Sequence, residues 1–233
     1  TNDAGLTWEA MTFPYQFSIT SLCMTSPQTG IIVGDSSSIL KTIDGGLHWQ
    51  TQPISNLTIG NFYFQNCIQS NNKTYIIGVN LTEQKGVFIT SEDGIQFTAS
   101  DIPISYDFAI VMDTLFIINL DGIYKASLKT LQFSWVPLGD STYSISIGAS
   151  PKNSLCFITT TIALAVGGRK FIFRTTDAMD TWNLLSYYPT GIINNIKFLN
   201  DTTGYLLCDN SNHIYRTTDG GATWLPERAV STK

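Results

Sequence analysis

Acidic side chains recur along this sequence at a near-regular spacing. One set stands in related phrases, of which TIDGGLHW (residues 42–49) and TTDGGATW (residues 217–224) are the clearest; its members are Asp3, Asp44, Asp93, Asp177 and Asp219. A second set precedes or follows short apolar runs; its members are Asp35, Asp107, Asp121 and Asp209. Two facing carboxylates can hydrolyse a glycosidic bond. We therefore ask first whether either set does that chemistry.

Other side chains that could take part in catalysis or bind a metal are sparse. The arginines are Arg169, Arg174, Arg216 and Arg228, and the histidines are His48 and His213. The four cysteines, Cys23, Cys67, Cys156 and Cys208, stand far apart and include no C-x-x-C pair. We therefore expect no metal site and no cofactor. We expect the cysteines to be buried and unpaired, as small apolar side chains.

Composition narrows the class of partner. The chain has 233 residues, a net charge of −5 and only 13% charged residues, so it offers no basic stripe for nucleic-acid phosphates. Hydrophobic residues make up 43%, which is typical of a folded globular protein. The most apolar run, residues 157–167, is too short to span a bilayer. We expect neither nucleic-acid binding nor membrane insertion.

The acidic phrases belong to an internal repeat. All five tryptophans, and one phenylalanine, end such a phrase: Trp8, Trp49, Phe97, Trp135, Trp182 and Trp224. The gaps between these positions are 41, 48, 38, 47 and 42 residues. Units of about 40–45 residues with four strands each are typical of propeller blades. The spacing therefore indicates a β-propeller.

The segments between the phrases read as strands. Before two phrases stand GIIVGDSSSILK and GYLLCDNSNHIYR, each an apolar run, a polar turn and a second β-rich run, which predicts a hairpin. Upstream of the hairpins lie candidate first strands at residues 17–24, 61–68, 108–112, 143–147 and 192–198. We predict an all-β propeller of four-stranded antiparallel blades in a single domain, 1–233. Its blades span about 15–53, 54–104, 105–140, 141–189 and 190–233, and residues 1–14 add an outer strand. Either these five blades close a ring or they are part of a larger one.

The repeated phrase, T/S-x-D-x-G-x-x-W, has a structural explanation; we call it the box. The short acid and the hydroxyl can accept hydrogen bonds from turn N–H groups, glycine supplies a positive φ, and the aromatic ring can pack on a neighbouring blade. We therefore predict structural roles for Thr1, Asp3, Gly5, Trp8, Thr42, Asp44, Gly46, Trp49, Ser91, Asp93, Phe97, Trp135, Thr175, Asp177, Trp182, Thr217, Asp219, Gly221 and Trp224.

The box resembles the Asp-box, or BNR, repeat, which marks propellers of sialidases, xyloglucan-type glycosidases, sortilin-like receptors and photosystem II stability/assembly factor-like proteins. The resemblance to the last family is strongest and covers nearly the whole chain. It implies that the box is structural, that the protein has no catalytic chemistry, and that it binds partner proteins during assembly. It also implies a positive patch from basic residues before the box; the matching positions are Lys41, Lys125, Arg174 and Arg216. The alternative for these four is a solvated strand end.

The expected function is thus a non-enzymatic protein-binding propeller, an assembly factor or interaction scaffold. A glycoside hydrolase or carbohydrate-binding propeller is the alternative, but Arg174 and Arg216 occupy repeat positions and the Arg-Ile-Pro signature of sialidases is absent. Asp35, Asp121 and Asp209 also fall in equivalent hairpin turns, where aspartate is common. A further alternative is one module of a larger secreted or surface protein. We expect an exported protein, whether periplasmic, cell-surface or secreted.

Overall fold

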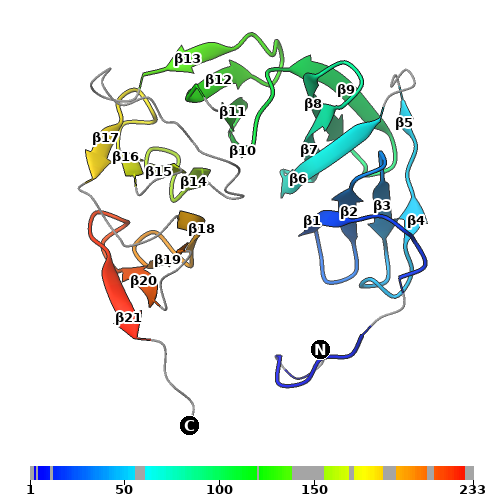
Figure 1. Cartoon of the computed structure of the whole chain (residues 1–233), viewed down its shortest axis with the longest axis horizontal. Coiled ribbons are helices and arrows are strands. Elements are labelled where there is room, and N and C mark those ends of the chain that lie inside the picture. Colours follow the sequence, from blue (N-terminus) through cyan, green and yellow to red (C-terminus); the bar gives the residue numbers. More distant parts are fainter. Residues whose placement is uncertain are drawn as a thin grey trace. The chain divides into compact units, whose positions relative to one another are not determined.

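The structure is all-β. The computed structural model describes Asp3 and residues 5–10, 13–55, 61–119, 121–137, 155–167, 171–185, 193–208 and 213–228. These residues form two compact units, within Thr1–Asp101 and Ile102–Lys233. Their strands make five sheets (Figure 1), which confirms the predicted fold class, a five-bladed β-propeller of antiparallel blades. None of the described residues forms a helix that could cross a membrane.

Unit 1 contains two sheets. Sheet 1 has the order β1-β2-β3-β4, from strands Ile19–Met24, Gly30–Gly34, Ile39–Thr42 and Gln50–Thr51. Sheet 2 has the order β5-β9-β8-β7-β6, from strands β5 Ile54–Ser55, β6 Phe62–Ser70, β7 Lys73–Asn80, β8 Lys85–Ser91 and β9 Phe97–Ile102. The short β5 is parallel to β9, whereas the pairs β1–β2, β2–β3, β3–β4, β6–β7 and β7–β8 are antiparallel. It is an outer strand that the sequence analysis did not predict.

Unit 2 contains three sheets, each four strands in chain order. Sheet 3 is β10 Asp107–Val111, β11 Thr114–Ile118, β12 Ile123–Ser127 and β13 Ser134–Val136. Sheet 4 is β14 Leu155–Phe157, β15 Ala163–Gly167, β16 Phe171–Thr175 and β17 Asn183–Leu185. Sheet 5 is β18 Ile193–Phe198, β19 Gly204–Cys208, β20 His213–Thr217 and β21 Leu225–Arg228.

Two predicted strands are not among those that the structure describes. We predicted 143–147 as the first strand of the fourth blade; those residues lie outside the described part of the chain, and the first strand of sheet 4 is β14. Cys156 lies in β14, as Cys23 lies in β1 and Cys67 in β6, so the cysteine position in the repeat identifies the strand correctly. The described residues of 1–14 form no strand, where an outer strand was expected.

The core of each unit lies between consecutive sheets. In unit 1, side chains of sheets 1 and 2 form one cluster, which includes Val33 and Phe64. In unit 2, one cluster joins sheets 3 and 4 and another joins sheets 4 and 5. The second strand of sheet 1, β2, is buried along its whole length. Because such a strand is covered on both faces, its sequence is a continuous apolar run, GIIVG, and does not alternate.

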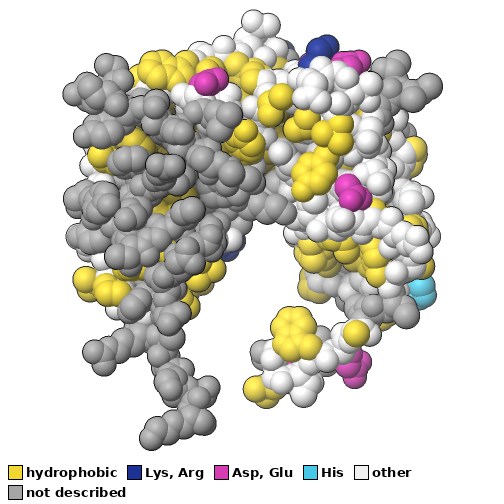
Figure 2. Space-filling model, in the orientation of Figure 1, with side chains coloured by type: hydrophobic (Ala, Val, Ile, Leu, Met, Phe, Trp, Pro, Cys, Tyr) yellow, Lys and Arg dark blue, Asp and Glu magenta, His cyan; other side chains and the backbone are white. Residues whose placement is uncertain are grey.

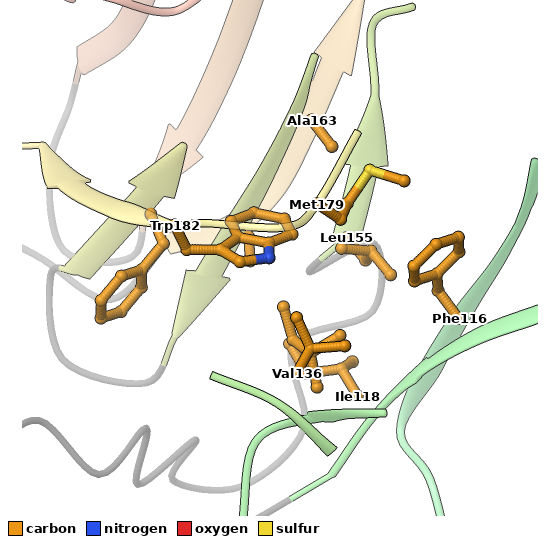
Figure 3. Packing of buried hydrophobic residues seen from close by; sticks show 10 residues of the cluster. Phe116, Ile118, Val136, Leu155, Ala163, Met179 and Trp182 are labelled. Atoms are coloured by element: carbon orange, nitrogen blue, oxygen red, sulfur yellow. The ribbon is translucent and has the colours of Figure 1, made fainter. Parts of the chain in front are cut away.

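The aromatic residues that end the boxes divide into buried and exposed rings. Trp182 and Trp224 are each 1% exposed and Phe97 is fully buried, whereas Trp8 is 78% exposed and Trp135 is 54% exposed. Figure 3 shows the ring of Trp182 beside Met179 and Leu155, with Phe116 beyond them. The expectation that each ring packs on a neighbouring blade is therefore wrong for Trp8 and Trp135. Trp49 is partly buried.

The buried and exposed rings give a matched stability test. Trp224→Ala removes a ring from the core between sheets 4 and 5, and we expect it to lower the free energy of unfolding by about 3–5 kcal/mol. Trp8→Ala removes an exposed ring and is expected to change it by less than about 0.5 kcal/mol. Urea unfolding followed by circular dichroism measures both. Equal costs for the two variants would contradict the packing role.

Candidate functional site: the box turns and their basic neighbours

A hydrogen-bonded network closes the box of sheet 1. The Thr42 hydroxyl donates to Asp44 Oδ1 (2.8 Å) and accepts from the backbone N–H of Gly46 (2.9 Å). Asp44 Oδ1 also accepts from the backbone N–H of His48 (2.9 Å), and Nδ1 of His48 lies 2.7 Å from Oδ2. Thr42 is only 1% exposed. One buried hydroxyl and one carboxylate thus satisfy the N–H groups of a tight turn.

The same network recurs in sheets 4 and 5. In sheet 4, the Thr175 hydroxyl donates to Asp177 Oδ1 (2.8 Å), and Asp177 accepts from the backbone N–H (3.0 Å) and hydroxyl of Thr181. In sheet 5, Thr217 and Asp219 make the equivalent bond (2.8 Å), and Thr223 donates to Asp219 in the same two ways. The N-terminal segment has half of this network, namely the two hydrogen bonds that the backbone N–H and the hydroxyl of Thr7 donate to Asp3. Thr1 lies outside the described residues.

The residue just before the tryptophan is a network member that the motif left unspecified. It is Thr7, Thr181 or Thr223 in three boxes and His48 in the fourth, and in each case it binds the box aspartate with both backbone and side chain. The recurrence of threonine before tryptophan was visible in the sequence and could have identified this position.

The middle boxes depart from the pattern. In sheet 2 the turn is one residue shorter, and Asp93 Oδ1 accepts from the backbone N–H groups of Ile95 (2.8 Å) and Gln96 (2.9 Å). Ser91 there replaces threonine and accepts from the N–H of Gly94 (2.9 Å). In sheet 3 no acid stands in the turn before Trp135, and the hydroxyl of Ser127 accepts a single bond from the Lys129 N–H (3.2 Å).

The box hydrogen bonds keep the aspartates ionised. The backbone and side chain of His48 lower the pKa of Asp44 to about 2, and the hydroxyl and backbone N–H of Thr181 lower that of Asp177 to about 2. The backbone N–H groups of Gln96 and Ile95 lower the pKa of Asp93. Burial raises the pKa of Asp219, but the hydrogen bonds from Thr223 outweigh it, so this pKa is lowered as well.

The box of sheet 5 has glycine at a position where the box of sheet 4 has methionine. Gly221 has φ +78°, and a Cβ there would lie 2.5 Å from Leu164 Cδ1. In sheet 4, Met179 occupies the equivalent position with φ 70°, next to Ala178 with φ 57°. Left-handed conformations cost a side-chain-bearing residue roughly 1–2 kcal/mol. The turn of sheet 4 therefore holds strain that the turn of sheet 5 avoids.

The four basic candidates do not all stand free. Lys41 of sheet 1 donates to the backbone carbonyl of Asp93 in the box of sheet 2 (2.9 Å). Arg174 of sheet 4 donates through Nε to the carbonyl of Gly220 in the box of sheet 5 (3.0 Å). Lys125 of sheet 3 lies 3.8 Å from Asp180 Oδ1 in the box of sheet 4. Three of the four thus reach the box turn of the next sheet within their unit. We call these contacts the inter-sheet bridges.

Arg216 behaves differently, since its guanidinium pairs with Glu227 of the same sheet (3.2 Å) and both side chains are nearly half exposed. The basic positions therefore combine two roles. Lys41 and Arg174 join sheets through charged hydrogen bonds to carbonyl groups, a role that neither of the sequence-based interpretations included. Among the described residues, Lys125 and Arg216 make only exposed ion pairs, which contribute little to stability.

The candidate catalytic carboxylates bind the main chain. Asp35 accepts from the N–H of Ser18 (3.0 Å), and Asp107, only 2% exposed, accepts from the N–H of Leu155 (3.0 Å) and so links sheet 3 to sheet 4. Asp121 lies exposed in the turn between β11 and β12, and Asp209 lies outside the described residues. Across the described ranges, no three His, Cys, Asp or Glu side chains gather as a metal site would require.

The four cysteines are free; Cys67 is buried and the other three are partly buried. Cys23 and Cys67 lie close enough to hydrogen-bond, and this bond, together with burial, raises the pKa of the Cys23 thiol. Cys67 Sγ also lies 3.9 Å from the carbonyl oxygen of Ile31, the strand partner of Cys23. The predicted unpaired state is confirmed for all four cysteines, whereas full burial holds only for Cys67.

The lowered pKa values predict an acid-dependent stability. Because the folded pKa values of Asp44 and Asp177 are about 2, below the ordinary value of about 3.9, the unfolded chain binds more protons between those pH values. The stabilisation is fully present above about pH 4 and is lost as the pH falls toward 2. Urea unfolding at several pH values should show a shallower acid loss in Asp44→Asn and Asp177→Asn than in wild type. Asp121→Asn, an exposed turn variant, should keep the wild-type slope; equal slopes in all variants would contradict the box interaction.

The inter-sheet bridge of Arg174 predicts a difference between two arginines. Arg174→Met leaves the aliphatic stem and removes the hydrogen bond to Gly220, so we expect a loss of about 1.5–3 kcal/mol in the free energy of unfolding. Arg216→Met removes an exposed ion pair and is expected to cost less than about 1 kcal/mol. Urea unfolding of unit 2, followed by tryptophan fluorescence, compares them. A larger cost at Arg216 would show that the bridge is not structural.

Comparison with known proteins agrees with the fold and the box. Residues 1–100 match the family described as Photosynthesis system II assembly factor YCF48. No curated protein matches the chain. The structure of YCF48 bound to D1 peptide superimposes with a TM-score of 0.61 and 15% sequence identity, over 94% of this chain and 85% of that one.

Two other solved structures place the fold in a wider group. The WD40 beta propeller domain of Doa1 has a TM-score of 0.63 at 8% identity, over 96% of this chain and 72% of that chain. The GH74 enzyme of Niastella koreensis has a TM-score of 0.55 at 13% identity, over 89% of this chain and 31% of that chain. At these identities the likeness concerns the fold alone. Together with the box turns, these comparisons agree with the resemblance inferred from the sequence: the chain is a β-propeller with Asp-box turns, and its first 100 residues match the family described as Photosynthesis system II assembly factor YCF48.

Proposed function

We propose that this protein is a non-enzymatic propeller that binds a partner protein, as an assembly factor or interaction scaffold. The match of residues 1–100 to an assembly factor family supports this, and a structure similar to the whole chain holds a bound peptide. The bound peptide belongs to that other protein, so for this chain a protein partner is part of the proposal.

The observation that carries the proposal is a set of apolar side chains on the box turns of unit 1. Their side chains are between 52% and 86% exposed; they are Leu6, Trp8, Ile43, Leu47 and Ile95. The bridge from Lys41 to Asp93 brings the turns of sheets 1 and 2 together, so Ile43, Leu47 and Ile95 lie on neighbouring turns. Figure 2 shows hydrophobic side chains at the surface of this unit, on the N-terminal segment as well. Exposed apolar side chains are typical anchors for another protein.

Two basic residues give the proposed partner-binding protein exposed positive charge. Lys125 and Arg216 are partly exposed and make only exposed ion pairs, so they remain available to steer an acidic partner toward the protein. Lys41 and Arg174 donate hydrogen bonds to carbonyl groups of the next sheet, so they are less available to contact a partner protein. The proposed contribution of charge therefore centres on Lys125 and Arg216.

The hydrolase alternative has less support. Two of its four candidate carboxylates, Asp35 and Asp107, already accept hydrogen bonds from the main chain, and the likeness to a GH74 enzyme concerns the fold. Carbohydrate binding remains the second candidate. An exported location, as a separate protein or as one module of a larger secreted or surface protein, stays a prediction.

The test is capture of the partner by surface variants. Purified wild type, Leu47→Asp with Ile95→Asp, and the control Leu199→Asp are immobilised in parallel and exposed to native extract with brief crosslinking. Leu199 is 68% exposed in the turn between β18 and β19 of unit 2, and it is not one of the five apolar side chains of the proposed surface. We expect the double variant to retain about tenfold less partner, since anchor side chains often contribute more than 1 kcal/mol each. The control should retain the wild-type amount.

Two outcomes would contradict the proposal. Equal capture by the double variant would exclude the box-turn surface. Turnover of chromogenic glycosides by wild type, lost in Asp35→Asn, would replace the scaffold with a hydrolase. Circular dichroism of each variant confirms that a loss of capture is not a loss of folding.

A further inference from the structure

A pocket of about 410 Å³ opens between sheets 3 and 4 of unit 2. Its walls are the turn between β10 and β11, the end of β12, the turn between β14 and β15, and the box of sheet 4. The repeat places an equivalent pocket between sheets 1 and 2, but this one measures only about 170 Å³. Ligand sites measure about 300–1,000 Å³. Equivalent positions of the repeat therefore line a pocket at both interfaces, and only the pocket between sheets 3 and 4 is large enough for a ligand.

A lysine lines each of the two pockets, and it makes a different contact in each. In the small pocket, Lys41 crosses to the carbonyl of Asp93, and its side chain lies against Gly94 (3.3 Å from Nζ to a Cβ built there). In the large pocket, Lys125 makes only a 3.8 Å contact with Asp180, whose side chain is 77% exposed. The ammonium group of Lys125 thus faces the large pocket without a close carbonyl partner among the described residues.

Three of the nine described non-glycine residues with left-handed backbone line the large pocket. Met112, Ala178 and Met179 all line it, with φ values of 53°, 57° and 70°. Met112 is 71% exposed, an unusual choice for a turn between two strands. Strain of this kind persists mainly where a ligand or partner makes use of it. At the base, Phe116 and Met179 are nearly fully buried and lie near one another (Figure 3).

We propose that this pocket receives an apolar side chain of the partner protein that is followed or preceded by a carboxylate. Two methionines and Phe116 offer an adaptable apolar lining for the side chain. The Lys125 ammonium and the hydroxyl of Ser127 or Thr160 offer donors to the carboxylate. Asp180 competes for Lys125, so it weakens the site. The inference deepens the proposed protein-binding function and rests on it.

The test uses methyl resonances of the pocket itself. The chain has four methionines, so ¹³C-methyl labelling gives four signals, of which Met112 and Met179 report on the pocket and Met24 on unit 1. The probe is the blocked tetrapeptide acetyl-Gly-Asp-Leu-Gly-amide, and its counterpart with Asn for Asp is the neutral control. We expect saturable shifts at Met112 and Met179 but not at Met24, and at least about fivefold weaker binding of the neutral peptide, as for loss of one charged contact.

Three variants separate the charge from the shape of the pocket. Lys125→Gln should weaken the acidic peptide about fivefold and leave the neutral one unchanged, whereas Asp180→Asn should tighten the acidic peptide. Lys41→Gln, at the equivalent position in unit 1, should change neither affinity. Three results would each overturn the proposed pocket. The first is a shift at Met24 as large as those at Met112 and Met179, and the second is the absence of a saturable shift at about 10 mM peptide, the millimolar range of weak contacts. The third is an affinity of Lys125→Gln for the acidic peptide equal to that of wild type. If the protein does not bind the peptide but still captures a partner from extract, only the pocket proposal is overturned. If it neither binds the peptide nor captures a partner, the proposed protein-binding function is overturned as well.

Discussion

The hydrogen bond between the box hydroxyl and the box aspartate is the interaction on which the other features of sheets 1, 2, 4 and 5 depend. A strand that turns back on itself leaves several N–H groups without ladder partners, and these are costly when buried. Thr42, Thr175 and Thr217 are each at most 1% exposed, and each orients an ionised carboxylate that accepts from the turn. The same turn fixes the start of the fourth strand, and hence the direction in which the aromatic ring leaves the sheet.

Sheets are then joined by contacts that the boxes present to their neighbours. Buried rings, above all Trp182 and Trp224, fill the space between sheets, and Lys41 and Arg174 bind carbonyl groups of the next box. Each of these carbonyl groups points outward because the N–H of the same peptide group donates inward to the box hydroxyl, from Gly94 to Ser91 and from Gly221 to Thr217. Each such box turn therefore has two roles: its hydrogen bonds close the turn within its own sheet, and its outward carbonyl accepts a hydrogen bond from the preceding sheet.

The larger of the two pockets lies between sheets 3 and 4. The turn of sheet 3 has no aspartate, the lysine beside it does not reach a carbonyl, and the gap to sheet 4 becomes a pocket with a strained wall at Met179. Natural proteins keep strain chiefly where it serves recognition. Loss of the motif in the middle of the chain is therefore consistent with a change of use at that interface, while the intact boxes hold the units.

The sequence by itself determined the repeat, the hairpins and the box, because these depend on residues within about four positions of one another, such as Thr42, Asp44 and His48. It could not determine that Trp8 and Trp135 are exposed or that Cys23 lies beside Cys67. Nor could it reveal the partners of Lys41 and Arg174, which lie 52 and 46 residues away. Only the tertiary structure decided these, since they depend on how one sheet packs on the next, and local spacing carries no information about that packing.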